Sequence, residues 1–185
     1  MIIVGYYGIG KSSLAGKENC IDLDIRPFLD SGDSMWYKTY LSVVESLSVQ
    51  GFVVLLPPNP IVRKHLRSLK ESIFYVYPSL ELKDYWERKM RKDWTIEELN
   101  GTLREGQKEY EYKLVVKNFE ADINEMKSDI FMRWEIMTRN YKLIDIIREI
   151  KANSTRGYCH FINTQTHIPD FSINDSECKD AIITG

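Results

Sequence analysis

Gly5-Tyr6-Tyr7-Gly8-Ile9-Gly10-Lys11-Ser12 follows directly on the apolar run Met1-Ile2-Ile3-Val4, and this opening stretch decides the expected fold. It fills every fixed position of the pattern G-x-x-x-x-G-K-[S/T], in which a glycine-rich loop leaves a strand and wraps around phosphate. Residues without a Cβ let backbone amides approach an anion closely. The alternative is a glycine-rich turn that merely joins a strand to a helix. The fit of both motif and context favours a phosphate-binding loop, or P-loop.

The motif assigns roles to individual side chains. Lys11 is expected to neutralise charge on the β and γ phosphates of a nucleoside triphosphate, and Ser12 is expected to ligate magnesium. The helix expected after the loop would add unpaired N–H groups and the positive end of its dipole. ATP and Mg²⁺ are therefore the expected cofactors, held by Gly5, Gly8, Ile9, Gly10, Lys11, Ser12 and Ser13.

Short apolar runs alternate with segments of helical periodicity along most of the chain. Strands are expected at residues 1–7, 19–23, 52–56, 73–77 and 133–138, and helices at 36–50, 61–69, 80–90, 112–126 and 141–150. Parallel strands need crossover connections that pack on the faces of the sheet. The alternation therefore predicts an α/β chain with the three-layer P-loop NTPase fold, a central parallel five-stranded sheet flanked by helices.

Composition limits the class of protein. The chain has 185 residues, of which 43% are hydrophobic and 28% charged, as in ordinary soluble domains. Lys and Arg number 25 against 27 for Asp and Glu, so no global positive field attracts polyanions. No apolar run approaches the roughly 18 residues of a membrane span, and no signal peptide opens the chain. We expect a cytoplasmic protein with no membrane partner, whose three cysteines are reduced.

Together, three features resemble the small P-loop kinases: the N-terminal motif, the run Ile21-Asp22-Leu23-Asp24, and the basic run Arg88-Lys89-Met90-Arg91-Lys92. More narrowly, the runs at 51–56 and 76–80 look like those of phage and bacterial deoxynucleotide or nucleoside kinases, which are adenylate-kinase-like. The resemblance covers the organisation of residues 1–151. It implies transfer of the ATP γ-phosphoryl to a nucleoside or (deoxy)nucleoside monophosphate. It also implies a kinase domain at 1–152 with a helical lid region at about 80–128, and a C-terminal extension at 153–185.

Carboxylates end the second expected strand, at the edge where such kinases bind their acceptor. Asp24 is the favoured catalytic residue, because it could accept the proton of an acceptor hydroxyl or hold magnesium through water. Asp22 is the second candidate for contact with the substrate. The alternative is that both aspartates only terminate the loop. The third strand ends in Leu55-Leu56-Pro57-Pro58 and offers no acidic residue for the metal, which departs from nucleoside monophosphate kinases.

Arginines supply the remaining candidates. Arg88 and Arg91 stand three apart on an expected helix, as lid arginines do when they close over a triphosphate. A favourable interaction with the helix dipole is their alternative role. Arg26 and Arg63 are candidates for gripping an acceptor phosphate, or are ordinary solvated charges.

Two other functions remain open. A polynucleotide or modified-base DNA kinase is suggested by Asp24-Ile25-Arg26, although the near-neutral charge speaks against nucleic acid as the acceptor. A nucleotide-gated binding protein without a phosphoryl acceptor is the other. The tail could add an edge strand at 158–162, and the spacing of Cys159, His160, His167 and Cys178 argues against zinc. The stripe of Trp86, Met90 and Trp94 is read as packing rather than a base platform.

Overall fold

The computed structural model describes residues 1–99, 107–129 and 131–155. The chain divides into two compact units, Met1–Leu143 and Ile144–Gly185. The first unit holds the whole sheet and the P-loop. The edge strand expected at 158–162 lies outside the described residues.

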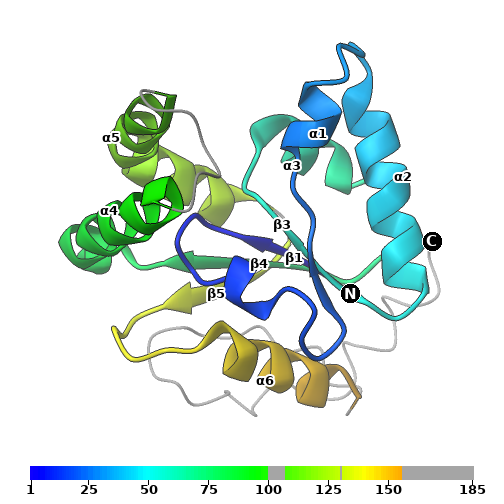
Figure 1. The fold of residues 1–185 in the computed structure, drawn as a ribbon. Coiled ribbons are helices and arrows are strands. Elements are labelled where there is room, and N and C mark those ends of the chain that lie inside the picture. Colours follow the sequence, from blue (N-terminus) through cyan, green and yellow to red (C-terminus); the bar gives the residue numbers. More distant parts are fainter. Residues whose placement is uncertain (100–106, 130, 156–185) are drawn as a thin grey trace. The chain divides into compact units, whose positions relative to one another are not determined.

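Five strands form one parallel sheet, which confirms that part of the prediction (Figure 1). They are β1 (Ile2–Gly5), β2 (Cys20–Asp22), β3 (Val53–Leu56), β4 (Ile73–Pro78) and β5 (Met132–Ile136), in the order β2-β3-β1-β4-β5. β1 is the central strand, with Ile3 opposite Leu55 of β3 and Phe74 of β4. All residues of β1, β3 and β4 are buried, as expected for parallel strands covered on both faces.

Helices connect the strands and complete an α/β fold. They are α1 (Arg26–Leu29), α2 (Trp36–Val49), α3 (Pro60–Leu66), α4 (Lys83–Leu99), α5 (Gln107–Ser128) and α6 (Leu143–Thr155). α2 contacts β3 and α3, while α5 contacts β4 and α4. Figure 1 shows α1, α2 and α3 gathered on the right, and α4 and α5 on the left. In the described part of the chain, no helix is both long and apolar enough to cross a membrane.

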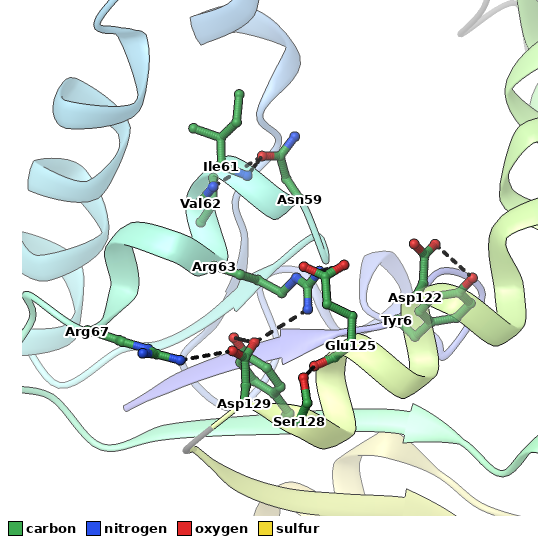
Figure 2. A network of polar contacts seen from close by, with 11 residues as sticks. Tyr6, Asn59, Ile61, Val62, Arg63, Arg67, Asp122, Glu125, Ser128 and Asp129 are labelled. Atoms are coloured by element: carbon green, nitrogen blue, oxygen red, sulfur yellow. Dashed lines mark hydrogen bonds and ion pairs between the residues drawn. The ribbon is translucent and has the colours of Figure 1, made fainter.

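The predicted helices are present with shifted ends. The helix expected at 80–90 begins with a 3-10 turn, η2 (Leu80–Leu82), and continues to Leu99 as α4. α3 starts sharply because the Asn59 side chain accepts hydrogen bonds from the amides of Ile61 and Val62 (Figure 2). Pro60 occupies its first turn, where no intrahelical donor is lost. The one-turn helix α1 was not predicted.

The segment after the P-loop differs most from expectation. Where a helix was expected after the loop, the chain forms only the 3-10 turn η1 (Ser12–Leu14) before turning toward β2. The turn uses Gly16 at φ +77°, and Glu18 and Asn19 also adopt positive φ. The Gly16 amide donates to the Cys20 carbonyl at 2.9 Å and closes the turn. A three-residue helix has almost no macrodipole, so any anion binding here must come from loop amides and side chains.

Candidate functional site

The P-loop leaves the carboxyl end of β1, in the middle of the sheet. After β1 the chain crosses to β2 on one side, and after β3 it crosses to β4 on the other. The strand order therefore reverses next to β1. In open parallel sheets, ligands bind outside the carboxyl ends of the strands at such a reversal.

Glycines are required in the loop for two different reasons. Gly8 and Gly10 have φ of +70° and +97°, a conformation that side chains with a Cβ rarely adopt. Gly5 instead allows close packing, since a Cβ there would lie 2.4 Å from Cδ1 of Ile9. The amides of Gly8, Gly10 and Lys11 donate none of the hydrogen bonds found among the described residues. Those three donors are therefore available to an anion.

Lys11 folds back across the loop. Its ammonium donates to the carbonyl oxygens of Gly5 at 2.7 Å and Tyr6 at 2.9 Å. Burial lowers its pKa from 10.5 to about 8, although the nearby carboxylate of Asp22 acts in the opposite direction. A bound phosphate would favour the charged ammonium in the same way as Asp22 does.

Ser12 and Asp22 meet at the edge of the loop. The Ser12 hydroxyl donates to Oδ2 of Asp22 at 2.7 Å, although the two residues lie on different elements, η1 and β2. Two neighbouring oxygen ligands, one of them charged, suit a hard cation such as Mg²⁺. Sequence analysis ranked Asp22 second, whereas the structure makes it the carboxylate that contacts the P-loop.

Asp24 lies two residues after Asp22 and pairs with Arg26. Its carboxylate accepts from the backbone amide of Arg26 at 3.0 Å, and from the Arg26 guanidinium at 2.7 Å and 2.6 Å. Partial burial alone would raise the pKa of Asp24, but the hydrogen bonds and charge of Arg26 outweigh it and lower the pKa. This local turn matches the loop-terminating role, and it also occupies Arg26, the candidate phosphate ligand.

Helix α4 reaches the P-loop through side chains other than the expected arginines. Trp86 donates from Nε1 to the Tyr7 carbonyl at 2.8 Å, and the Lys89 ammonium donates to the Gly8 carbonyl. A Cβ on Gly8 would lie 2.8 Å from Cγ of Met90, so the helix packs tightly on the loop. Trp86 and Met90 are buried, which confirms their predicted packing role.

The two arginines of α4 lie on its exposed side. Arg91 lies 5.7 Å from the ring centre of Tyr112 on α5. Their predicted role in closing over a triphosphate stays a prediction.

Arg63 lies in a charged network between α3 and α5 (Figure 2). Only 3% of its side chain is exposed, and its guanidinium lies 2.6 Å from Glu125 and 3.4 Å from Asp129. Asp129 also accepts a hydrogen bond from Tyr75 at 2.9 Å and pairs with Arg67 at 3.4 Å. Arg63 therefore already has carboxylate partners at the place where an acceptor phosphate was expected.

The network continues to the P-loop through Tyr6. The Tyr6 hydroxyl donates to Asp122 of α5 at 3.4 Å, as Figure 2 shows. Burial raises the pKa of Asp122, although the hydrogen bond from Tyr6 and the charge of Arg63 oppose the rise. Asp122 and Glu125 on α5, and Asp129 directly after its end, recur at helical spacing. That spacing was the available signal for these acidic residues, and sequence analysis did not use it.

Sequence analysis thus located the loop but not all of its neighbours. The structure brings together Lys11, Ser12 and Asp22, and keeps Asp24 with Arg26. Lys89 was missed, although its spacing from Trp86 places both on one side of a helix. No group of three or more His, Cys, Asp and Glu residues that could hold a metal occurs within residues 1–99, 107–129 and 131–155. The cysteines and histidines of the tail lie outside those ranges.

Comparisons with protein-family models, with curated proteins and with solved structures found no match to this chain.

Proposed function

We propose that the chain is an ATP- and Mg²⁺-dependent phosphotransferase of the P-loop kinase type. The proposed reaction moves the γ-phosphoryl of ATP to a nucleoside or a (deoxy)nucleoside monophosphate. The observation that supports it best is the complete P-loop motif at the carboxyl end of β1, in a parallel sheet of order β2-β3-β1-β4-β5. Position and motif agree with the expected P-loop NTPase fold.

The residues present fit a triphosphate. Amides of Gly8, Gly10 and Lys11 can donate to phosphate oxygens, because positive φ at the two glycines turns the backbone around a small concave loop. The Lys11 ammonium, now bound to two loop carbonyls, can transfer its hydrogen bonds to phosphate oxygens of opposite charge. Lys11 then stabilises charge that develops during transfer.

Ser12 and Asp22 fit magnesium. Ser12 would ligate the ion directly, and Asp22 would bind either the ion or one of its waters. Magnesium would supply charge neutralisation between the β and γ phosphates. This arrangement does not need a carboxylate at the end of β3, where the chain has Leu56 and then Pro57.

Asp24 remains the proposed acceptor for the proton of the substrate hydroxyl. Its exposure at the edge beside β2 makes it accessible to an acceptor. The ion pair with Arg26 stabilises the charged carboxylate and so lowers the pKa of Asp24, which makes Asp24 a weaker base. Phosphoryl transfer depends mainly on positioning and electrostatics, so a weak base is sufficient.

Transfer of label from ATP tests the proposal. The protein is incubated with γ-labelled ATP, Mg²⁺, and a panel of nucleosides, nucleoside monophosphates and oligonucleotides. We expect label on a nucleoside or a monophosphate, and no transfer by Lys11→Ala, which should remain folded because the change leaves the buried loop side chains Tyr6 and Ile9 in place. Label on an oligonucleotide would replace the small acceptor by a nucleic acid. Label released only as inorganic phosphate would refute the kinase proposal.

A further inference from the structure

Helix α4 holds two consecutive carbonyl groups of the P-loop. The Tyr7 carbonyl accepts from the Trp86 indole at 2.8 Å, and the next carbonyl, of Gly8, accepts from the Lys89 ammonium. Both donors come from a single turn of α4, three residues apart.

Lys89 is itself held in position. Its ammonium lies 4.8 Å from the ring centre of Trp86 and 5.4 Å from that of Tyr141. It also donates to the Tyr141 hydroxyl at 3.2 Å. The Trp86 and Tyr141 rings stack with centres 5.8 Å apart. The faces of the two aromatic rings attract the ammonium electrostatically, and this attraction holds Lys89 in one location.

Fixing these carbonyls also fixes the amides that follow them. A peptide group is planar and trans, so its N–H points away from its C=O. With the Tyr7 carbonyl directed to Trp86, the Gly8 amide is directed away from α4. With the Gly8 carbonyl directed to Lys89, the Ile9 amide is directed away from it as well. These two amides belong to the segment expected to bind phosphate.

Glycine makes this orientation easy to lose. Gly8 has φ +70°, but glycine populates positive and negative φ about equally, so the loop backbone does not select this conformation by itself. Without donors on α4, either peptide group could rotate and present its carbonyl oxygen to the anion. A carbonyl oxygen repels phosphate.

We infer that Lys89 and Trp86 are positioning residues that orient the P-loop amides for the triphosphate. Lys89 acts through the Gly8 peptide and need not touch the nucleotide. The inference rests on the proposed function for the identity of the ligand, whereas the orientation of the peptides is a property of the free protein. The two can therefore be tested apart.

The first test needs no nucleotide. Amide ¹H and ¹⁵N resonances of Gly8 and Ile9 are compared between wild type, Lys89→Met, and Lys92→Met, in which an exposed lysine of the same helix is lost. Methionine keeps most of the lysine stem, so packing beside Trp86 changes little. We expect shifted or broadened Gly8 and Ile9 signals only in Lys89→Met. Signals that stay at their wild-type positions would overturn the inference.

The second test measures Mg·ATP affinity by calorimetry. We expect Lys89→Met to weaken binding by about tenfold or more, because the competent loop becomes a minor population, while Lys92→Met stays near wild type. Lys89→Arg should recover most of the affinity, since a guanidinium can still donate to the Gly8 carbonyl. Trp86→Phe keeps the charge and removes the other donor. Weaker binding in that variant supports positioning, while wild-type affinity would show that Lys89 acts only by its charge.

Failure of the proposed function gives a different pattern. A wild-type protein that binds no Mg·ATP, with altered Gly8 and Ile9 signals in Lys89→Met, would refute the nucleotide proposal and leave the orientation by α4 intact. Binding by wild type with equal affinity in Lys89→Met would refute the positioning role alone.

Discussion

Gly8→Ala tests whether α4 and the P-loop are packed as tightly as the structure indicates. Gly8 has φ +70°, and a left-handed conformation costs a residue with a Cβ about 1–2 kcal/mol. The new Cβ would also lie 2.8 Å from Cγ of Met90, well inside van der Waals contact. Met90 is buried, so its side chain has to leave its preferred rotamer, at about 0.5–1.5 kcal/mol. The two costs add to a loss of about 1.5–3.5 kcal/mol of unfolding free energy, somewhat reduced because alanine restricts the unfolded chain more than glycine does.

Gly16→Ala is the matched control. Gly16 has φ +77°, but a Cβ there meets nothing within 4 Å. Its cost therefore includes the same backbone strain and the same unfolded-state effect, without the contact to α4. The difference between the variants isolates the contact with Met90, at about 0.5–1.5 kcal/mol. In a chain of this size, each kcal/mol of unfolding free energy corresponds to roughly 2–4 °C of melting temperature.

Urea denaturation followed by circular dichroism measures these differences. Met90→Ala and the double variant Gly8→Ala/Met90→Ala complete a cycle, in which the shorter residue at position 90 should relieve the strain. We expect the double variant to be more stable than the sum of the single losses predicts. A Gly8→Ala variant no less stable than Gly16→Ala, with additive effects in the cycle, would refute close packing of α4 on the loop.

Four further predictions concern the charged residues of the site. Since burial holds the Lys11 pKa at about 8, Lys11 of the free protein loses its proton above that pH. Mg·ATP affinity measured by calorimetry should therefore be constant below about pH 8 and fall by up to tenfold per pH unit above it. An affinity that stays constant through this range would contradict the role assigned to Lys11. Asp22→Asn should raise the Mg²⁺ concentration needed for half-maximal turnover. Asp24→Asn should instead lower turnover at saturating Mg·ATP by about 10²-fold or more. Turnover of Asp24→Asn within a few-fold of wild type would exclude Asp24 as the base. Arg63→Met should lower the unfolding free energy, measured by urea denaturation, by about 1–3 kcal/mol. This loss is smaller than for a fully buried ion pair, because Glu125 is exposed and Asp129 keeps its contacts with Arg67 and Tyr75. Wild-type stability with a raised KM for the acceptor would show that Arg63 binds substrate instead.

The three inner strands, β1, β3 and β4, could be recognised from the sequence because each is a short apolar run. A run such as 52–56 has one possible environment, a strand buried on both faces, and β3 occupies Val53–Leu56. The helical segment expected after Lys11 is only the three-residue turn η1, because local signals conflicted. The motif favours a helix, but Gly16 and the positive φ of Asn19 turn the chain into β2 within a few residues.

The function of charged residues was harder to anticipate. Arg63, Arg88 and Arg91 all fit a phosphate-binding role in sequence, because a guanidinium suits both phosphate and carboxylate. In the structure, Arg63 forms ion pairs with Glu125 and Asp129, which lie more than sixty positions away in the chain. Only α5 packing beside α3 could reveal that pairing.

Residue spacing and runs of one chemical kind were enough to predict the parallel α/β sheet and the glycine-rich loop that leaves its central strand. Tertiary structure alone decided the partners of the loop. Asp22 rather than Asp24 binds Ser12, and Lys89 rather than Arg88 or Arg91 binds Gly8. The physical reason is that one position along a strand or helix turns a side chain to another face, while the composition of the segment stays the same. Which face meets the loop depends on how β2 and α4 are placed in space, and this is set by the packing of the whole domain.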